Sequence, residues 1–444
     1  MNLIYGIKDK PKFGQMLVFA FQQILAILAA TIAVPAIIGN GMSQAAALFG
    51  AGVGTIIYIL FTKANSPVFL GSSFAFIGSM FAAFGGAASI SVGYLGLIIG
   101  AACAGLVYVI IAIVVKCVGV NWINKLMPPV VIGPTVAIIG LSLAGNAVGD
   151  LTTGKVLVDG VSAASPYVCL ICGLVTLFGV VLCSVYGKKM AKLIPFIIGI
   201  LAGYGVATIF TVIGIAPETV ALQVIDFAAF KEMTIFAVPE FTFVEAFKGV
   251  KEVDVQYILT VAVAYVPVAF VVFAEHIADH KNLSSIIGQD LLEKPGLHRT
   301  LLGDGIGSMV GAFFGGCPNT TYGESVGCVA ITRNASVVTI ITTAILCMVI
   351  SFFGPFVTFL ASIPNCVMGG VCITLYGFIA VSGLKMIQKV DLGQNKNLFV
   401  VAVILITGIG GLVVSFGKVT ITSIACALIL GILTNIMLAK GKEA

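Results

Sequence analysis

The chain has 444 residues, of which 59% are apolar and only 9% are charged, and its mean hydropathy is +1.16. A typical soluble domain carries roughly 25% charged residues, so this composition excludes a water-soluble fold. The apolar residues form charge-free runs of about 20, the length at which a helix crosses the hydrocarbon core of a bilayer. Because lipid tolerates no unpaired backbone groups, we expect an all-α polytopic membrane protein.

The first apolar run raises the question of a signal peptide, since Lys8, Lys10 and Lys12 precede it. The run continues from Met16 to Ile38, which is longer than the apolar core of about 7–15 residues in a signal peptide. We interpret it as an uncleaved first membrane span.

Full membrane spans are predicted near residues 15–38, 44–62, 92–115, 128–148, 167–186, 194–215, 256–276, 300–315, 335–353, 364–383, 398–415 and 419–439. Two further apolar segments are too short to cross as regular helices. They run from Pro67 to Phe84 and from Pro318 to Thr332. If each is a broken span, the chain has fourteen.

The distribution of basic residues orients these spans, because lysine and arginine accumulate on cytoplasmic loops. With fourteen spans and a cytoplasmic N-terminus, all but five of the 23 lysines and arginines fall on the inner side. The outer five are Lys155, Lys231, Lys248, Lys251 and Lys418, and the rule has little force in the long outer segment that holds three of them. Both termini are therefore predicted to be cytoplasmic.

The two broken spans indicate an internal repeat, since each is the third span of a seven-span half. A second pair of matches supports this: Pro128-x4-Gly133 opens the fifth span and Pro364-x4-Gly369 opens the twelfth. Seven is an odd number, so the two halves must be inverted relative to each other. Inverted repeats with interrupted helices at equivalent positions are typical of transporters that bind substrate near the membrane midplane.

Each broken span is predicted to contain a short strand followed by a half-helix. Pro67 and Pro318 cannot donate backbone hydrogen bonds, while Gly71 and Gly323 permit close approach of another backbone. The residues between them, such as Val68 and Phe69, favour extended structure.

The first residues of a half-helix present unpaired N–H groups and a partial positive charge. We expect Ser73 and Phe74 in one half, and Gly323 and Glu324 in the other, to donate to ligand oxygens. Such a site suits a small molecule that bears carbonyl groups.

Acids within membrane spans are costly and mark functional sites. Glu324 lies in the second broken segment, Asp304 lies in mid-span, and Glu275 ends an uncharged run that begins at Ile258. On topology alone, Glu275 fits an ordinary boundary acid as well as a site residue, and Glu324 could instead be a capping carboxylate.

Carboxylates accept N–H groups while half-helix termini donate to C=O groups, so together they match a cyclic amide or imide such as a pyrimidinedione. Buried carboxylates can also take up a proton, which would couple transport to a proton gradient.

The cysteines and glycines favour helix packing over chemistry. Cys169 and Cys172 form a C-x-x-C within an apolar run, without a second pair or a nearby histidine. Gly303, Gly305 and Gly307 lie within a span and follow no strand, so they do not indicate a dinucleotide site.

The histidines His276, His280 and His298 lie near one cytoplasmic boundary without metal-ligand spacing, so we interpret them as interfacial residues. No metal site, cofactor, enzyme activity or nucleic-acid partner is expected.

Several motifs resemble the nucleobase-ascorbate transporters, the nucleobase:cation symporter 2 family, and especially their bacterial uracil permeases. They are G-S-S-F-A-F at Gly71 to Phe76, A-E-H at Ala274 to His276, P-G-L-H-R at Pro295 to Arg299 and P-N-T-T-Y-G-E at Pro318 to Glu324. The family signature is similar to Glu324-Ser325-x-Gly327-x4-Thr332-Arg333.

The resemblance implies two inverted seven-span halves divided into a core domain and a gate domain, commonly in a homodimer. The core domain would comprise residues 1–116 and 252–354, and the gate domain residues 117–251 and 355–444. Substrate would bind between the two domains.

By similarity, Glu275 and Glu324 would accept hydrogen bonds from the base, the backbone of Phe74 and Gly323 would donate to its carbonyls, and Ala30 would line the pocket. Tyr322 would support the site from beside Glu324. Glu275 is the expected proton carrier, because it would touch both substrate and a polar cytoplasmic stretch. Further proton relays are expected at Asp279, His280 and Asp304.

The sequence departs from the family pattern at three places. Relatives often have Gln-His in the first span, where this chain has Gln22-Gln23. Asparagine usually follows the acid of the signature, and here Ser325 does. Some uracil permeases have a histidine at the position of Asp279.

The expected function is the import of uracil across the inner (cytoplasmic) membrane by proton symport with alternating access. A permease for xanthine or another purine base is the alternative within the family, and sodium is the alternative coupling ion. An anion transporter of the same architecture is the alternative from another class, although such proteins usually end in a soluble C-terminal domain.

Overall fold

The computed structural model describes residues 3–119, 128–158, 161–188, 190–215, 219–231, 233–416 and 419–438. Lys418, one of the five outer lysines, and residue 439, the end of the last predicted span, lie outside these ranges.

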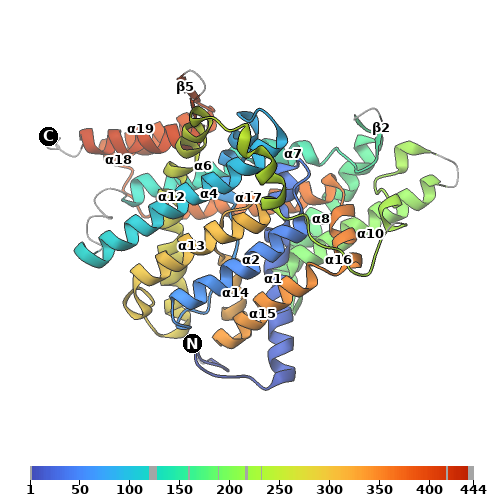
Figure 1. Ribbon diagram of the computed structural model, residues 1–444, viewed down its shortest axis with the longest axis horizontal. Coiled ribbons are helices and arrows are strands. Elements are labelled where there is room, and N and C mark those ends of the chain that lie inside the picture. The colour runs from blue at the N-terminus through green and yellow to red at the C-terminus, as the bar shows by residue number, and fades with distance from the viewer. Residues whose placement is uncertain are drawn as a thin grey trace.

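The protein is built from apolar helices, as the composition predicts (Figure 1). In the described part of the chain, eight helical segments are long and apolar enough to cross a membrane. They are α1 (Phe13–Ile38), α2 (Gln44–Phe61), α4 (Ile90–Val118), α6 with α7 (Pro129–Ser142 and Ala144–Asp150), α8 (Pro166–Tyr186), α10 (Pro195–Ile215), α12 (Val255–Ile287) and α17 (Asn365–Ile387). Shorter apolar helices are η1 with α3 (Phe74–Phe76 and Ile77–Gly85), α15 (Val337–Ile350), α18 (Asn395–Ile409) and α19 (Ser423–Leu438). The prediction of a multi-pass helical membrane protein is confirmed.

Other helices complete or connect these segments. They are α9 (Met190–Leu193), η2 (Val220–Leu222), η3 (Ala228–Phe230), α11 (Thr242–Ala246), η4 (Phe247–Lys251), η5 (Leu292–Gly296), α13 (Leu297–Gly315), α14 (Gly323–Thr332) and α16 (Gly354–Ser362). Two small hairpins pair β2 (Leu157–Val158) with β3 (Val161–Ser162), and β5 (Val414–Phe416) with β6 (Val419–Ile421).

The two short apolar segments each form a strand followed by a half-helix, as their prolines and glycines indicate. Strand β1 (Leu70–Ser72) leads into η1 and α3, and β4 (Asn319–Thr321) leads into α14. The strands pair antiparallel with Gly71 opposite Thr320. Segments some 250 residues apart thus meet in the interior, and their half-helices start from one small sheet.

Several boundaries differ from the sequence prediction. Helix α12 continues to Ile287 instead of ending at residue 276, because the polar side chains after Ala274 find partners inside the protein. Helix α18 ends at Ile409, and the β5–β6 hairpin occupies the stretch assigned to the ends of two spans. The span predicted from residue 335 to 353 is α15, which ends at Ile350, and a separate short helix, α16, begins after it at Gly354.

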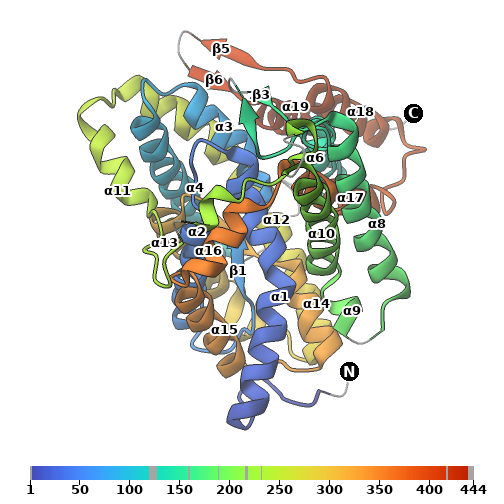
Figure 2. The same ribbon diagram turned by 90° about the vertical axis from the view of Figure 1, so that its right-hand side faces the viewer.

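The helices pack in two groups (Figure 2). In one, α13 packs against α2 and α4, and α15 packs against α2. In the other, α17 packs against α6 and α8, α10 against α8, and α18 against α19 and α6. Helices α1 and α12 contact members of both groups.

Small residues allow the closest of these packings. A Cβ on Gly307 would lie 2.7 Å from the carbonyl oxygen of Gly54, and a Cβ on Gly305 would lie 2.7 Å from Cβ of Tyr108. The interpretation of the glycines near residue 305 as helix-packing residues is confirmed. Cys169 and Cys172 are likewise buried on the face of α8 that packs against α17.

Candidate substrate-binding site

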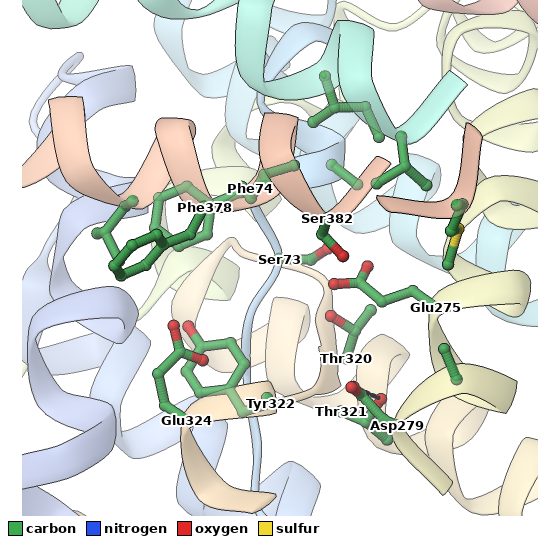
Figure 3. Close-up of a pocket in the computed structure, with 18 of the residues that line it drawn as sticks. Ser73, Phe74, Glu275, Asp279, Thr320, Thr321, Tyr322, Glu324, Phe378 and Ser382 are labelled. Atoms are coloured by element: carbon green, nitrogen blue, oxygen red, sulfur yellow. Dashed lines mark hydrogen bonds between the residues drawn. The ribbon is translucent and has the colours of Figure 1, made fainter. Parts of the chain in front are cut away.

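A cavity of about 390 Å³ opens where the two half-helices begin (Figure 3). Its volume lies within the range of roughly 300–1,000 Å³ that holds small molecules. The two half-helix starts, α12, α6, α10 and α17 supply its lining: Ser73, Phe74, Ala75, Val136, Ile139, Phe196, Glu275, Ala278, Asp279, Thr320, Thr321, Tyr322, Gly323, Glu324, Leu375, Phe378, Ile379, Ser382 and Met386. The predicted binding residues Ser73, Phe74, Glu275, Tyr322, Gly323 and Glu324 all lie in this set.

The half-helix termini at the cavity carry no side-chain caps. Ser73 precedes η1 and Tyr322 precedes α14, and neither side chain accepts a hydrogen bond from the first turn of its helix. The first turn of any helix has N–H groups without intrahelical partners. The backbones at Phe74 and Gly323 therefore present donors and partial positive charge at the cavity.

Tyr322 fixes the relative position of the two strands. Its hydroxyl donates to the carbonyl oxygen of Ser72 at 2.7 Å, and its ring lies directly over Gly71. A Cβ at position 71 would overlap that ring, so the contact requires glycine. The ring thereby holds the β1–β4 pair closed beneath the cavity.

The departures at Gln23 and Ser325 lie in contact with each other. Gln23 Nε2 donates to Ser325 Oγ at 2.6 Å, and the backbone N–H of Phe69 donates to the same oxygen at 3.1 Å. Ser325 thus joins α1, the segment before β1 and the half-helix that carries Glu324. The two departures from the family pattern therefore meet in one hydrogen bond.

Three carboxylic side chains line the cavity. Glu324 extends from the first turn of α14, whereas Glu275 comes from α12 and lies across the cavity from it (Figure 3). Asp279 lies one helical turn beyond Glu275 and accepts a hydrogen bond from the Thr321 hydroxyl at 2.8 Å. The cavity therefore offers acceptors on two sides and helix-terminal donors between them.

The opposite wall is apolar. Val136, Ile139, Phe196, Leu375 and Phe378 come from α6, α10 and α17, and Ser382 is the polar side chain that α17 adds. Sequence reasoning missed this wall, because its residues are ordinary apolar residues of membrane spans. The arrangement suits a flat ring with polar edges and an apolar face.

The remaining predicted residues lie outside the cavity lining. Ala30 is buried within α1. His280 and Asp304 are buried behind the cavity, where His280 bonds to Tyr58 and Asp304 bonds to His276. His276 and His280 are fully buried, so their interpretation as interfacial residues is wrong: hydrogen bonds within the protein satisfy them. Only the pairing of two helices brings these groups together, and no pattern along the chain signals it.

In the described ranges, no group of three or more histidine, cysteine, aspartate or glutamate side chains is arranged to hold a metal ion. The site can bind a neutral polar ring by hydrogen bonding.

Comparison with known proteins decides the family. The model of the Permease family, which is named for xanthine and uracil permeases, matches residues 14–416. The chain belongs to this family. It is therefore a membrane transporter rather than an enzyme, and the resemblance seen in its motifs is confirmed.

Relatives in the family match nearly the whole chain. The chain is 38% identical to the uracil permease of Bacillus caldolyticus, with 99% of this chain and 96% of that protein covered. It is 37% identical to the uracil permease of Bacillus subtilis (strain 168), with the same coverage. It is 33% identical to the uracil permease of Escherichia coli (strain K12), with 96% of this chain and 92% of that protein covered.

Solved structures of anion transporters share the fold of this permease. The transmembrane domain of the cyanobacterial bicarbonate transporter BicA matches with a TM-score of 0.63 at 17% identity, covering 98% of this chain and all of that one. The murine anion transporter Slc26a9, in its inward-facing state, matches with a TM-score of 0.67 at 13% identity, covering 97% and 69% of the two chains. At these identities the likeness concerns the fold alone.

Proposed function

We propose that this permease imports uracil across the cytoplasmic membrane by proton symport with alternating access. The observation that carries the proposal is the cavity in which Glu275 and Glu324 face the uncapped starts of two half-helices. The names of relatives at 33–38% identity over nearly their full length support uracil as the substrate.

The cavity complements the edges and the face of a uracil ring. Uracil has alternating carbonyl and N–H groups around a flat ring. The carboxylates of Glu275 and Glu324 accept from ring N–H groups, and the backbone N–H groups at Phe74 and Gly323 donate to the carbonyls. Phe378 and its apolar neighbours cover the ring face, where aromatic rings stack favourably.

The transport cycle that we propose uses fourteen spans arranged as two inverted repeats, with a core domain moving against a gate domain. The antiparallel pairing of β1 with β4, each followed by a half-helix, supports the repeat. The two packing groups of helices support the two domains, and the protein is proposed to work as a homodimer. With both termini cytoplasmic, the cavity lies toward the cytoplasm, since Phe196 and Met386 come from the inner ends of their helices.

Glu275 is the proposed proton carrier of this cycle, since its side chain faces the substrate cavity. Protonation of a carboxylate there reduces the repulsion among three neighbouring acids and so favours loading. Asp279 shares the cavity wall, while His280 and Asp304 lie behind it as proposed relays.

The acids of the cavity also argue against the anion alternative. Glu275, Asp279 and Glu324 all line it, and an anion placed among three carboxylates would be repelled. A purine base offers the same kinds of edge as uracil but is larger, so selectivity between bases requires measurement.

Competition binding tests the proposal. Purified permease should bind radiolabelled uracil, and unlabelled uracil should displace it at lower concentration than xanthine. Bicarbonate or sulfate should not displace it. Stronger displacement by xanthine would reassign the substrate within the family, and displacement by either anion would contradict the proposed recognition.

A further inference from the structure

Behind the substrate cavity lies a buried pair that the recognition of uracil does not use. His276 of α12 and Asp304 of α13 are 0% and 1% exposed, and His276 Nδ1 lies 2.6 Å from Asp304 Oδ2. On the other side of the ring, His276 Nε2 lies 2.9 Å from the hydroxyl oxygen of Thr300. Both ring nitrogens are therefore engaged.

The hydrogen-bond partners of Thr300 define the proton count of this pair. Its hydroxyl donates to the carbonyl oxygen of Leu297 at 3.0 Å, so its single proton is in use. His276 Nε2 must then be the donor to Thr300. The pair is consequently either an imidazolium with a carboxylate or a neutral imidazole with a carboxylic acid. In both forms it holds one proton more than a neutral histidine beside a carboxylate.

The surroundings favour keeping that proton. Without it the pair would carry one negative charge in a place closed to water, which is strongly unfavourable. His280 stacks on His276 with ring centroids 4.0 Å apart, and its Nδ1 donates to the His276 carbonyl oxygen at 2.8 Å. Its Nε2 lies 2.6 Å from the hydroxyl oxygen of Tyr58, which also bonds to Ser66 Oγ at 2.7 Å. The other titratable groups nearby on the packed helices bring no positive charge: Tyr108 on α4, and Glu275 and Asp279 on α12.

A second, very small cavity adjoins Asp304. It measures about 10 Å³, and its polar lining residues are Tyr108, Asp304, Ser308, Asn319 and Thr320. Within the described part of the chain, Asp304 Oδ1 and Tyr108 Oη have no hydrogen-bond partner although both are buried. A polar cavity needs roughly 10–15 Å³ to hold one water, so this one has room for a single water molecule at most.

Thr320 connects this small cavity to the substrate site, because it lines both. It belongs to β4, directly opposite Gly71 in the strand pair from which both half-helices start. The route from Asp304 to the substrate cavity therefore needs one water and one side chain.

We propose that His276 and Asp304, with one water in the small cavity, form a proton-binding site that exchanges its proton with the substrate cavity at Thr320. The proposal rests on the proton symport proposed above and names where a transported proton is held. On release, the proton passes through the water to a carboxylate of the substrate cavity. The Thr300 hydroxyl then turns from Leu297 to donate to His276 Nε2, while Nδ1–H donates to the Asp304 carboxylate. Every bond of the pair is kept, and only the proton leaves.

Asp304→Asn tests the proposal. An amide at this position donates N–H to His276 Nδ1 and stays neutral, so it imitates the proton-loaded pair but cannot release a proton. In proteoliposomes with a pH-sensitive dye inside, the variant should still exchange internal for external uracil. It should lose the proton flux that accompanies net uracil entry. Asp290→Asn changes an exposed aspartate in the same way and should keep that flux.

Wild-type proton flux in Asp304→Asn would overturn the proposal. A second result would also overturn it: a sodium gradient drives uptake by the wild type, and Asp304→Asn abolishes this sodium dependence. The small cavity would then bind sodium instead of water.

A substrate-free measurement separates this proposal from the proposed function. In wild-type protein labelled with ¹⁵N-histidine, NMR should show Nε2 of His276 protonated at neutral pH, with the signal assigned by its loss in His276→Gln. An unprotonated Nε2 would overturn the proposal even if Asp304→Asn failed to fold. Failure of the wild type to bind uracil would instead refute the proposed function and leave the NMR result to decide on the pair.

Discussion

Glu324→Gln is the substitution that tests substrate recognition most sharply. The carboxylate is purely an acceptor, and its side chain projects from the first turn of α14 into the cavity (Figure 3). Glutamine has nearly the same shape, but it replaces one acceptor oxygen with an N–H₂ donor. Where the base presents an N–H group, this donor faces another donor.

The expected loss of uracil affinity follows from the kind of hydrogen bond that the substitution removes. A hydrogen bond to a charged group contributes about 1.5–3 kcal/mol, so losing one should raise the dissociation constant of uracil on the order of 10- to 100-fold. The fold should be unaffected, since Glu324 is only half-buried at the cavity wall. Binding of radiolabelled uracil to purified protein measures the effect, with the thermal midpoint of the same sample as a check on folding.

Glu293→Gln provides a matched control, because it makes the same change at an exposed position outside the cavity. It should bind uracil like the wild type. Wild-type affinity in folded Glu324→Gln would remove this carboxylate from the site and refute the reasoning.

Three further substitutions probe other parts of the site. Glu275→Gln should lose proton-driven uptake while some exchange of base persists. Normal uptake by this variant would instead support Glu275 as an ordinary acid at the membrane boundary. Gly71→Ala should displace the Tyr322 ring, which should lower the free energy of unfolding by about 1–3 kcal/mol and weaken uracil binding. Gly78→Ala should do neither, because a Cβ there would make only an ordinary contact with Ile424 at 3.8 Å. Equal behaviour of the two variants would contradict the packing role of Gly71. Phe378→Ala should weaken uracil binding by removing the cover of the ring face, and unchanged affinity would place the base elsewhere.

Much of the site was predictable because its signals are local. Pro67 and Pro318 forbid regular helix, and glycines follow each of them, so a strand and a half-helix were expected at both places and are present. An acid such as Glu324 within an apolar segment stands out in the sequence, because burying a carboxylate in a membrane is energetically unfavourable. Composition and span length likewise predicted a multi-pass helical protein.

What the sequence concealed depends on contacts between distant segments. The end of α12 was placed too early because Glu275 and His276 look like the polar end of a span, and only the pairing with α13 shows that His276 is buried. The apolar wall from α6, α10 and α17 carries no signal that distinguishes it from lipid-facing residues. Gln23 and Ser325 are 302 positions apart in the sequence but hydrogen-bond to each other. The sequence therefore showed two separate departures from the family pattern, and only the structure shows that they are in contact.

The most direct test of the central claim is uracil uptake into proteoliposomes that contain only this permease, with an acidic outside, a neutral inside and no sodium. Proton symport predicts that labelled uracil transiently accumulates above its external concentration, and that a protonophore abolishes this accumulation. Uptake no greater than that of protein-free liposomes would contradict uracil transport. Uptake that ignores the pH gradient and follows an imposed sodium gradient would contradict proton coupling.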